Sequence, residues 1–201
     1  MYFYDLLRRI DHIDGDIVEC GAKRGRSLFA LIAACRRLGS SRRFIGYDAF
    51  SDYPQPAPED EPETHKYGNP GHADSGALAR QHLPNSGIDL AFVDVKVKIV
   101  KGPFPRTMPG YDGNAIAHLH LDCDMYVEHA QAMHHFYPKV ARGGVVVFDE
   151  YHEKSLFPGA RRAIDDYLDG SAEIQRSGVT DHCHVFKGVC ESPEGKHQAY
   201  A

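Results

Sequence analysis

Asp16-Ile-Val-Glu-Cys-Gly-Ala-Lys-Arg-Gly-Arg-Ser27 is the stretch that decides the fold. Ile17 and Val18 are apolar and typical of a buried strand, and Glu19 interrupts that apolar run. Gly21 and Gly25 then bracket a turn, after which Ser27 can cap a helix that has apolar residues at helical spacing. A strand, a glycine turn and a helix in this order expose backbone N–H groups and let a ligand approach the backbone closely. The stretch therefore predicts a ligand site with an acid at the strand end.

The next strand is predicted at 43–48, and it too ends in an acid, Asp48. In α/β sheets an acid at this point accepts hydrogen bonds from ribose hydroxyls. The first turn has the spacing Glu-x-Gly-x-x-x-Gly-x-Ser, which matches neither the Gly-x-Gly-x-x-Gly dinucleotide motif nor a P-loop. The glycine turn and Asp48 together predict a cofactor that contains a nucleoside and lacks a pyrophosphate.

Strands and helices alternate along the chain, which predicts an α/β fold with a mainly parallel sheet and helices on both faces. The segment 51–74 is rich in proline and has no aliphatic stripe, and we interpret it as a mobile flap over the site or, alternatively, as a solvated insertion. We expect one domain at 1–190 and a loose tail at 191–201. The expected elements are a helix at 1–10, a strand–helix unit at 16–39, strands at 43–48, 95–100, 115–122 and 143–150, helices at 76–83, 126–139 and 159–168, and two short strands within 173–187.

The bulk composition is that of an ordinary globular protein. The chain has 201 residues, of which 42% are hydrophobic and 25% charged, and this size suits one domain. A formal net charge of −5 argues against nucleic acid or a membrane surface as a partner, and no apolar run approaches the ~20 residues that span a bilayer. The five cysteines show no repeat spacing and fit reduced thiols, so we expect a cytoplasmic protein.

Acidic residues end four of the predicted strands: Glu19, Asp48, Asp122 and the pair Asp149-Glu150. Because ligands bind at the carboxyl ends of parallel strands, we expect these acids to meet at one rim of the sheet. Three oxygen ligands from Asp122, Asp149 and Glu150 suit a hard divalent cation such as Mg²⁺, whose charge would also relieve the repulsion among the carboxylates. The alternative is that these acids cap helices or face water.

Two histidines precede Asp122 within its predicted strand. His118 and His120 share the parity of Asp122, so all three point to the same face. Histidines inside a largely apolar strand are expected to be packed core residues rather than ligands.

Five motifs resemble those of the macrocin O-methyltransferase family, also described as TylF/MycF-like. The resemblance runs in register from about residue 15 to 168, and the first motif is also similar to that of catechol O-methyltransferases. The motifs are Glu19-Cys-Gly-Ala-Lys-Arg-Gly-Arg-Ser27, Gly46-Tyr-Asp-Ala-Phe50, Lys101-Gly-Pro-Phe104, Leu121-Asp-Cys-Asp-Met-Tyr126 and Gly143-Gly-Val-Val-Val-Phe-Asp-Glu-Tyr151.

The resemblance implies a Rossmann-like class I methyltransferase fold, with a mostly parallel seven-stranded sheet, helices on both faces and an antiparallel C-terminal hairpin. It further implies an enzyme that uses S-adenosyl-L-methionine and Mg²⁺ (or Ca²⁺) to methylate a hydroxyl of a sugar or another natural-product intermediate. By matching position, the cofactor-binding residues would be Glu19, Gly21, Gly25, Ser27, Asp48, Ala49, Gly102, Phe104 and Asp122. The metal ligands would be Asp122, Asp149 and Glu150.

The chain departs from the family pattern at the site. The family has Asp-Asp-Tyr where this chain has Asp149-Glu150-Tyr151, and Met125 stands where catechol enzymes place a lysine base. Three catalytic residues are therefore open as proton acceptors: Asp122, Asp124 and His152. The family's N-terminal extension is not present before residue 1, so we expect the substrate to be capped by the 51–74 flap or by a partner subunit, which leaves a homodimer or higher homo-oligomer open.

Two other functions fit parts of the sequence. Asp122-Cys-Asp124 also matches the Asp-x-Asp motif of metal-dependent glycosyltransferases, although a bound diphosphate would prefer basic partners to Glu19 and Asp48. A binding domain with a decayed methyltransferase site is the non-catalytic alternative.

Overall fold

A mostly parallel sheet forms the centre of the computed structural model, which describes residues 2–51, 54–60, 90–152, 156–191 and 197–199. Seven strands lie in the order β3-β2-β1-β4-β5-β7-β6. The first five are parallel to their neighbours, whereas β7 runs antiparallel to both β5 and β6. The strands are β1 (Asp16–Cys20), β2 (Phe44–Asp48), β3 (Val97–Lys101), β4 (Ile116–Leu121), β5 (Val140–Phe148), β6 (Gln175–Arg176) and β7 (Cys183–Phe186). This topology confirms the predicted class I methyltransferase fold.

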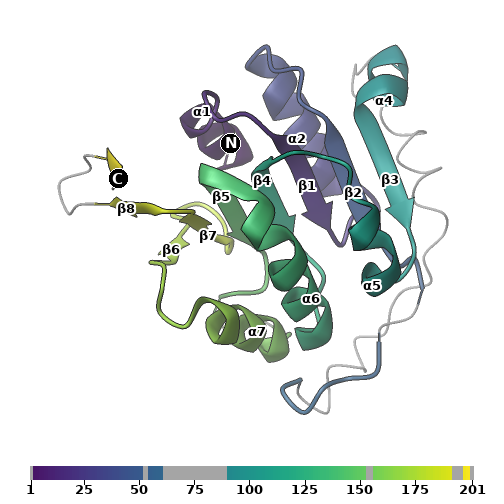
Figure 1. Ribbon diagram of the computed structural model, residues 1–201, viewed down its shortest axis with the longest axis vertical. Helices are drawn as coiled ribbons and strands as arrows, with labels where there is room; N and C mark the ends of the chain where they lie inside the picture. Colours follow the sequence, from purple (N-terminus) through teal and green to yellow (C-terminus); the bar gives the residue numbers. More distant parts are fainter. Residues whose placement is uncertain (1, 52–53, 61–89, 153–155, 192–196, 200–201) are drawn as a thin grey trace.

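Helices cover both faces of this sheet (Figure 1). One apolar cluster packs α6 and α7 against one face, and a second packs α1 and α2 against the other. Successive residues of a strand point to opposite faces, so Val18 belongs to the first cluster and Ile17 to the second. The helices are α1 (Tyr2–Arg9), α2 (Arg26–Arg37), α4 (Leu90–Lys96), α5 (Phe104–Thr107), α6 (Tyr126–Phe136) and α7 (Pro158–Leu168), with 3₁₀ turns η3 (Met108–Gly110) and η4 (Tyr137–Lys139).

Strand β5 is covered on both faces. Val145, Val146 and Val147 of β5 have no exposed surface, as expected for a strand with helices on both sides. Burying each such side chain stabilises the fold by about 1.5–3 kcal/mol. No helix among the described residues is long and apolar enough to cross a membrane.

The ends of two elements differ from the expectation. Helix α4 continues to Lys96, so β3 begins at Val97 rather than at Val95, and its pairing with β2 starts there. Ser27 does not cap α2, because the N-cap residue is Gly25 and Ser27 lies inside the first turn. Gly25 has a φ of 73°, in the left-handed region. Residues with a side chain rarely adopt this backbone conformation, whereas glycine adopts it freely.

Helix α6 buries its histidine-containing stripe. The buried residues are His129, Ala132, Met133 and Phe136, which follow the i, i+3, i+4, i+7 spacing of one helix face. If the histidines of α6 are counted as polar residues, the sequence pattern predicts that the neighbouring face of the helix packs against the core. In the structure that neighbouring face is only partly buried.

Parts of the predicted flap and tail are described. The tail predicted to be loose at 191–201 contributes to a separate antiparallel hairpin, in which β8 (Val189–Glu191) pairs with β9 (His197–Ala199). Within 191–201, backbone pairing is described for Glu191 and residues 197–199 only, so the loose tail stays a prediction. Within the flap, Asp60 is buried and accepts a hydrogen bond of 3.0 Å from the backbone N–H of Tyr126. Residues 52–53, 61–74 and the helix predicted at 76–83 lie outside the described residues.

Gly21 brings the end of β1 against the chain that follows β4. Its φ is 93°, and a Cβ built there would overlap the carbonyl oxygen of Asp122. We expect Gly21→Ala to destabilise the protein by about 3 kcal/mol or more, because a backbone clash adds to the left-handed strain.

Gly39→Ala is the matched control, since Gly39 has a φ of 73° but a Cβ there would meet nothing within 4 Å. Strain alone should cost about 1 kcal/mol, or about 2–4 °C in Tm for a protein of this size. Equal losses of Tm in the two variants would contradict the packing role of Gly21.

Candidate active site

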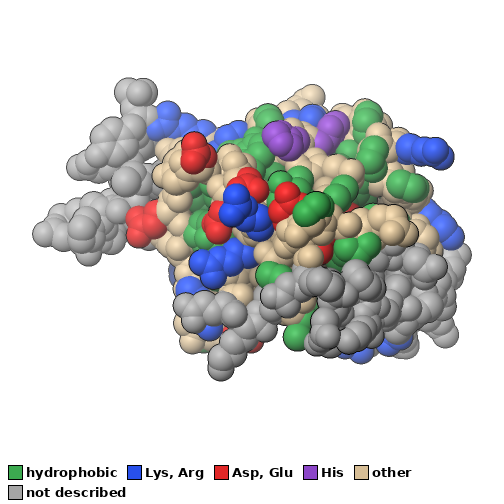
Figure 2. Space-filling view, turned by 90° about the horizontal axis from the view of Figure 1, so that it is seen from below, with side chains coloured by type: hydrophobic (Ala, Val, Ile, Leu, Met, Phe, Trp, Pro, Cys, Tyr) green, Lys and Arg blue, Asp and Glu red, His purple; other side chains and the backbone are tan. Residues whose placement is uncertain are grey.

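Acids from three strands, β2, β4 and β5, meet at one rim of the sheet, where β1 lies between β2 and β4. Asp48 ends β2, Asp122 directly follows β4, and Asp149 and Glu150 directly follow β5. Figure 2 looks onto this end of the molecule and shows acidic side chains gathered beside Lys and Arg side chains. The structure thus brings together the acids of β2, β4 and β5, as the sequence predicted.

Asp48 holds two turns in place. One oxygen of its carboxylate accepts a 2.7 Å hydrogen bond from the backbone N–H of Lys23, and the other accepts one of 2.7 Å from Phe50. The backbone carbonyl of Asp48 also accepts a 2.9 Å hydrogen bond from Gly102 N–H. Ala49 lies between the bonded residues, so the predicted cofactor positions Asp48, Ala49 and Gly102 are adjacent. Each carboxylate oxygen keeps a second lone pair for a ligand hydroxyl.

Lys23 neutralises part of the acidic rim, a role that our sequence analysis did not identify. Its Nζ donates to Asp122 at 2.8 Å and to Asp124 at 3.1 Å. Burial alone would lower the pKa of Lys23, but the carboxylates of Asp122 and Asp124 outweigh it and raise that pKa. The ammonium is therefore firmly charged and compensates two buried acids.

The acids of the rim differ in the direction of their pKa shifts, because burial, mutual repulsion and neighbouring positive charges act on each of them to a different extent. Burial raises the pKa of Asp122 to about 7 against the opposing charge of Lys23. The pKa of Glu150 is raised well above its usual range by burial and by the neighbouring Asp122 and Asp124. Asp149 behaves in the opposite way: burial opposes its ionisation, yet its pKa is lowered because His182 hydrogen-bonds to it.

Two histidines contact the acid pair: His182 faces Asp149, and His129 Nε2 lies 3.8 Å from Glu150 Oε2. The Nε2 atom of His182 lies 2.8 Å from Asp149 Oδ1, whereas His152, the predicted candidate, belongs to neither metal-ligand cluster found among the described residues.

A signal for His182 does exist in the strand register. Because Cys183 pairs with Phe148 across the antiparallel β7 and β5, the residue before Cys183 lies opposite the residue after Phe148.

Glu19 lies below the rim instead of on it. Its side chain is fully buried and faces His120, with 2.8 Å between Glu19 Oε1 and His120 Nδ1. Strand alternation explains the position, because Glu19 points to the same face as Ile17, towards α1 and α2. No surface of Glu19 is exposed to a ligand in this structure, so its predicted role as a cofactor contact stays a prediction.

Three other predicted cofactor residues have structural roles. Gly25 is the N-cap of α2, Ser27 is partly buried in the first turn of that helix, and Phe104 begins α5 with its side chain in the core. Their contact with a cofactor also stays a prediction.

Asp122, Asp149 and Glu150 fit a hard divalent cation. One oxygen from each lies within 4.8 Å of the others, and oxygen-only ligand sets suit Mg²⁺ or Ca²⁺. Glu150 Oε2 is buried without a hydrogen-bond partner among the described residues, and His129 Nε2 lies 3.8 Å from it. A buried carboxylate oxygen without a hydrogen bond has room for a cation as its partner. The extra methylene of Glu150 therefore does not keep its carboxylate from the predicted set.

A hollow lies at the opposite ends of the strands. This cavity of about 780 Å³ is lined by residues that include Asp16, Arg42, Arg43 and Asp112. Arg43 pairs there with Asp16 at 2.7 Å and with Asp112 at 3.1 Å. The charges are thus compensated within the chain, and the acids that end β2, β4 and β5 lie elsewhere.

The fold is that of class I methyltransferases. The solved structure of the O-methyltransferase NovP superposes with a TM-score of 0.77 at 22% identity, over 92% of this chain and 78% of that chain. The structure of an SAH-bound methyltransferase from Podospora anserina, PaMTH1, superposes with a TM-score of 0.58 at 13% identity, over 92% and 76%. At these identities the likeness concerns the fold.

The chain belongs to the macrocin O-methyltransferase (TylF) family, whose family model matches residues 6–179. A curated relative from Streptomyces olivaceus is named 8-demethyl-8-(2,3-dimethoxy-alpha-L-rhamnosyl)-tetracenomycin-C 4'-O-methyltransferase. It is 27% identical over 176 residues, which cover 84% of this chain but only 66% of that protein. The family assignment confirms the resemblance read from the motifs and argues against the glycosyltransferase alternative.

Glu128 gives the site a testable pH dependence. Burial, followed by the charges of Asp124 and Asp48, raises the pKa of Glu128 from 4.5 to about 8. A raised pKa means that the folded state binds the proton more tightly, so this stabilisation is complete below pH 4.5 and is lost as the pH rises through 8.

We expect Glu128→Gln to remove this loss. Its stability relative to the wild type should rise between pH 4.5 and 8, reaching on the order of 2 kcal/mol. Urea unfolding of both proteins across this range measures the difference, and a difference that does not change with pH would contradict the assignment.

Proposed function

We propose that this protein is an S-adenosylmethionine-dependent O-methyltransferase that acts on a hydroxyl of a small molecule, such as a sugar or a natural-product intermediate, with Mg²⁺ at the acidic rim. The observation that carries the proposal is the meeting of two features at one rim. Asp48 and the glycine turn lie at the ends of β2 and β1, and the oxygen ligands of Asp122, Asp149 and Glu150 lie at the ends of β4 and β5. Family membership supports the reaction class.

When bound, S-adenosylmethionine would supply the methyl group on a sulfonium, and Mg²⁺ would supply the charge that favours an ionised hydroxyl. The chain itself contributes positioning, which is the main requirement of an in-line displacement. Asp48 fixes the glycine turn through Lys23 N–H and offers lone pairs to ribose hydroxyls. Asp149, whose pKa is lowered by its hydrogen bond with His182, would hold the cation.

Asp122 and Asp124 are the proton acceptors that the geometry favours. Both contact the ammonium of Lys23, which would stabilise the carboxylate before the proton moves. Burial raises the pKa of Asp122, which is the direction that makes a carboxylate a stronger base. His152 remains a third candidate. We further propose that the 51–74 segment or a partner subunit covers the bound substrate.

Calorimetry with S-adenosylhomocysteine, with and without Mg²⁺, tests the cofactor. We expect binding to the wild type and a weakening of about 10-fold or more in Asp48→Ala, because a charge-assisted hydrogen bond contributes roughly 1.5–3 kcal/mol. Asp149→Ala is the matched control, since Asp149 lies on the metal side of the rim and should leave this affinity nearly unchanged. Unchanged affinity in Asp48→Ala would contradict the placement of the nucleoside.

Methyl transfer from labelled S-adenosylmethionine to a panel of rhamnosylated polyketides tests the reaction. We expect EDTA and Asp149→Ala each to abolish transfer, whereas Glu150→Asp, which restores the family's acid pair, should retain it. Full activity in EDTA would contradict a metal-dependent reaction and would leave a protein base alone, with Asp122 and His152 as the first residues to test.

A further inference from the structure

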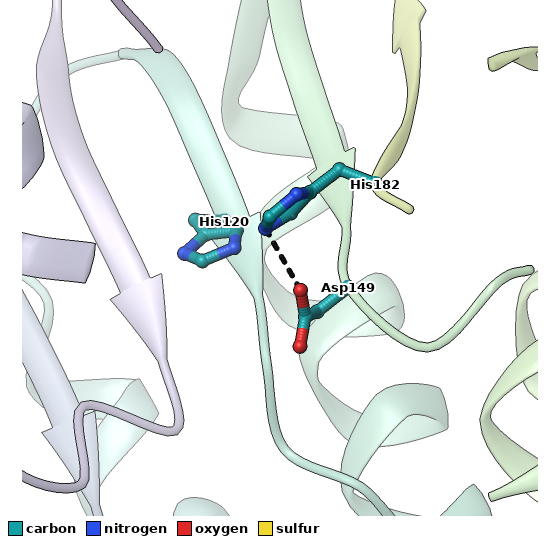
Figure 3. Close-up of side chains that lie close together, drawn as sticks. All are labelled: His120, Asp149 and His182. Atoms are coloured by element: carbon teal, nitrogen blue, oxygen red, sulfur yellow. Dashed lines mark ion pairs between the residues drawn. The ribbon is translucent and has the colours of Figure 1, made fainter. Parts of the chain in front are cut away.

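A second ligand cluster lies beside the oxygen set, and its donors are mainly nitrogen. His120 comes from β4, Asp149 follows β5, and His182 precedes β7 (Figure 3). One ligand atom from each of the three lies within 4.8 Å of the others. Figure 3 shows the two imidazole rings next to each other above the carboxylate of Asp149. The acidic rim therefore has a histidine-containing side that the proposed methyl transfer does not use.

His120 is held in the orientation of a metal ligand. Its Nδ1 lies 2.8 Å from Glu19 Oε1, and the side chains are 1% and 0% exposed. A carboxylate accepts hydrogen bonds, so this contact places the proton of His120 on Nδ1. The Nε2 atom is buried and has no hydrogen-bond partner among the described residues. A carboxylate behind one ring nitrogen and an unpaired second nitrogen are typical of histidines that bind metal.

His182 is also held through both ring nitrogens, although its Nε2 is paired with the carboxylate of Asp149 rather than unpaired. Its Nδ1 lies 2.9 Å from the hydroxyl oxygen of Thr180, and its Nε2 lies 2.8 Å from Asp149 Oδ1. Helix α1 packs over both rings, since the ring of Phe3 is 5.2 Å from that of His120 and 5.5 Å from that of His182. These contacts fix the rings and exclude water from their buried side. The expectation that His120 is a packed histidine thus describes its surroundings but not its free nitrogen.

We propose that His120 Nε2, His182 Nε2 and Asp149 bind one divalent first-row transition ion of the Zn²⁺ class. Two imidazoles and one carboxylate form a ligand set that suits Zn²⁺ and keeps one coordination position open. Imidazole nitrogen disfavours Mg²⁺, which prefers oxygen. Tetrahedral bonds of about 2.0–2.2 Å place two ligand atoms about 3.4 Å apart. His182 Nε2 and Asp149 Oδ1, which are 2.8 Å apart, must therefore separate slightly, and both side chains are partly exposed and can make that movement.

Asp149 belongs to both clusters, so the two sites are coupled. One of its oxygens can face the histidines while the other faces Asp122 and Glu150. An ion on the histidine side would therefore change the affinity of the oxygen side for Mg²⁺, and the reverse must hold equally. This second site goes beyond the proposed function, which needs only the oxygen set.

Titration with Co²⁺, a spectroscopic probe for a Zn²⁺ site, tests the proposal. We expect one Co²⁺ per chain, with visible absorption typical of nitrogen ligation, and displacement by stoichiometric Zn²⁺. Glu19→Gln should weaken the affinity by about 10–100-fold, because it removes the carboxylate that orients His120. His182→Ala and His182→Gln remove a ligand and should weaken it further. His182 is 22% exposed, so these variants are expected to fold, which thermal unfolding would check.

Two controls separate this site from its surroundings. His152→Ala changes a histidine close to the acid pair but outside the cluster, and Glu150→Gln damages only the oxygen set; both should keep the Co²⁺ spectrum. Anomalous diffraction from a Zn²⁺-soaked crystal should place the ion between His120, Asp149 and His182. An unchanged Co²⁺ spectrum in both His182 variants, or its loss in Glu150→Gln alone, would overturn the proposal.

S-adenosylhomocysteine calorimetry on His182→Ala distinguishes the two proposals. Cofactor affinity should survive in this variant while Co²⁺ binding is lost. If the wild type bound S-adenosylhomocysteine but no Co²⁺, only the histidine site would be wrong.

Discussion

The ion pairs between Lys23 and the acids that follow β4 are the interaction on which the rim depends. Parallel strands deliver carboxylates to one edge of the sheet, and burial makes each of them harder to ionise. The Lys23 ammonium lies 2.8 Å from Asp122 and 3.1 Å from Asp124. Its charge offsets part of the repulsion that burial and proximity create, and this allows a set of acids to share a small volume.

The same turn links the charge to the backbone. Asp48 accepts the N–H of Lys23, and Lys23 adopts a φ of 42°, which directs its side chain from the β1 turn towards Asp122. The chain of contacts thus runs from the end of β2, through the glycine turn, to the end of β4. A ligand that bound at Asp48 and one that bound at Asp122 would both contact this turn, which explains how one short loop can serve two subsites.

Strand alternation and the positions of acids made the fold and the rim predictable from the sequence. The remaining features depended on tertiary structure. Ile17 and Glu19 are two residues apart in β1, so the sequence shows that their side chains point to the same face of the sheet. Only the tertiary structure, in which α1 packs on this face, shows that Glu19 is fully buried there. His182 became apparent through the antiparallel register of β7 and β5, which sequence spacing does not fix. The contacts of Lys23 depend on a positive φ and a side-chain conformation that no pattern of residue types encodes.

The stability of Lys23→Met, measured with and without Mg²⁺, tests most directly whether positive charge holds the acidic rim together. Methionine keeps much of the side-chain volume and removes the charge. At neutral pH we expect a loss of about 1–2 kcal/mol, because solvent screens a lysine that is 38% exposed while the buried acids lose their partner. Millimolar Mg²⁺ should restore the lost stability by occupying the oxygen set. Wild-type stability in the variant, together with no response to Mg²⁺, would contradict this account.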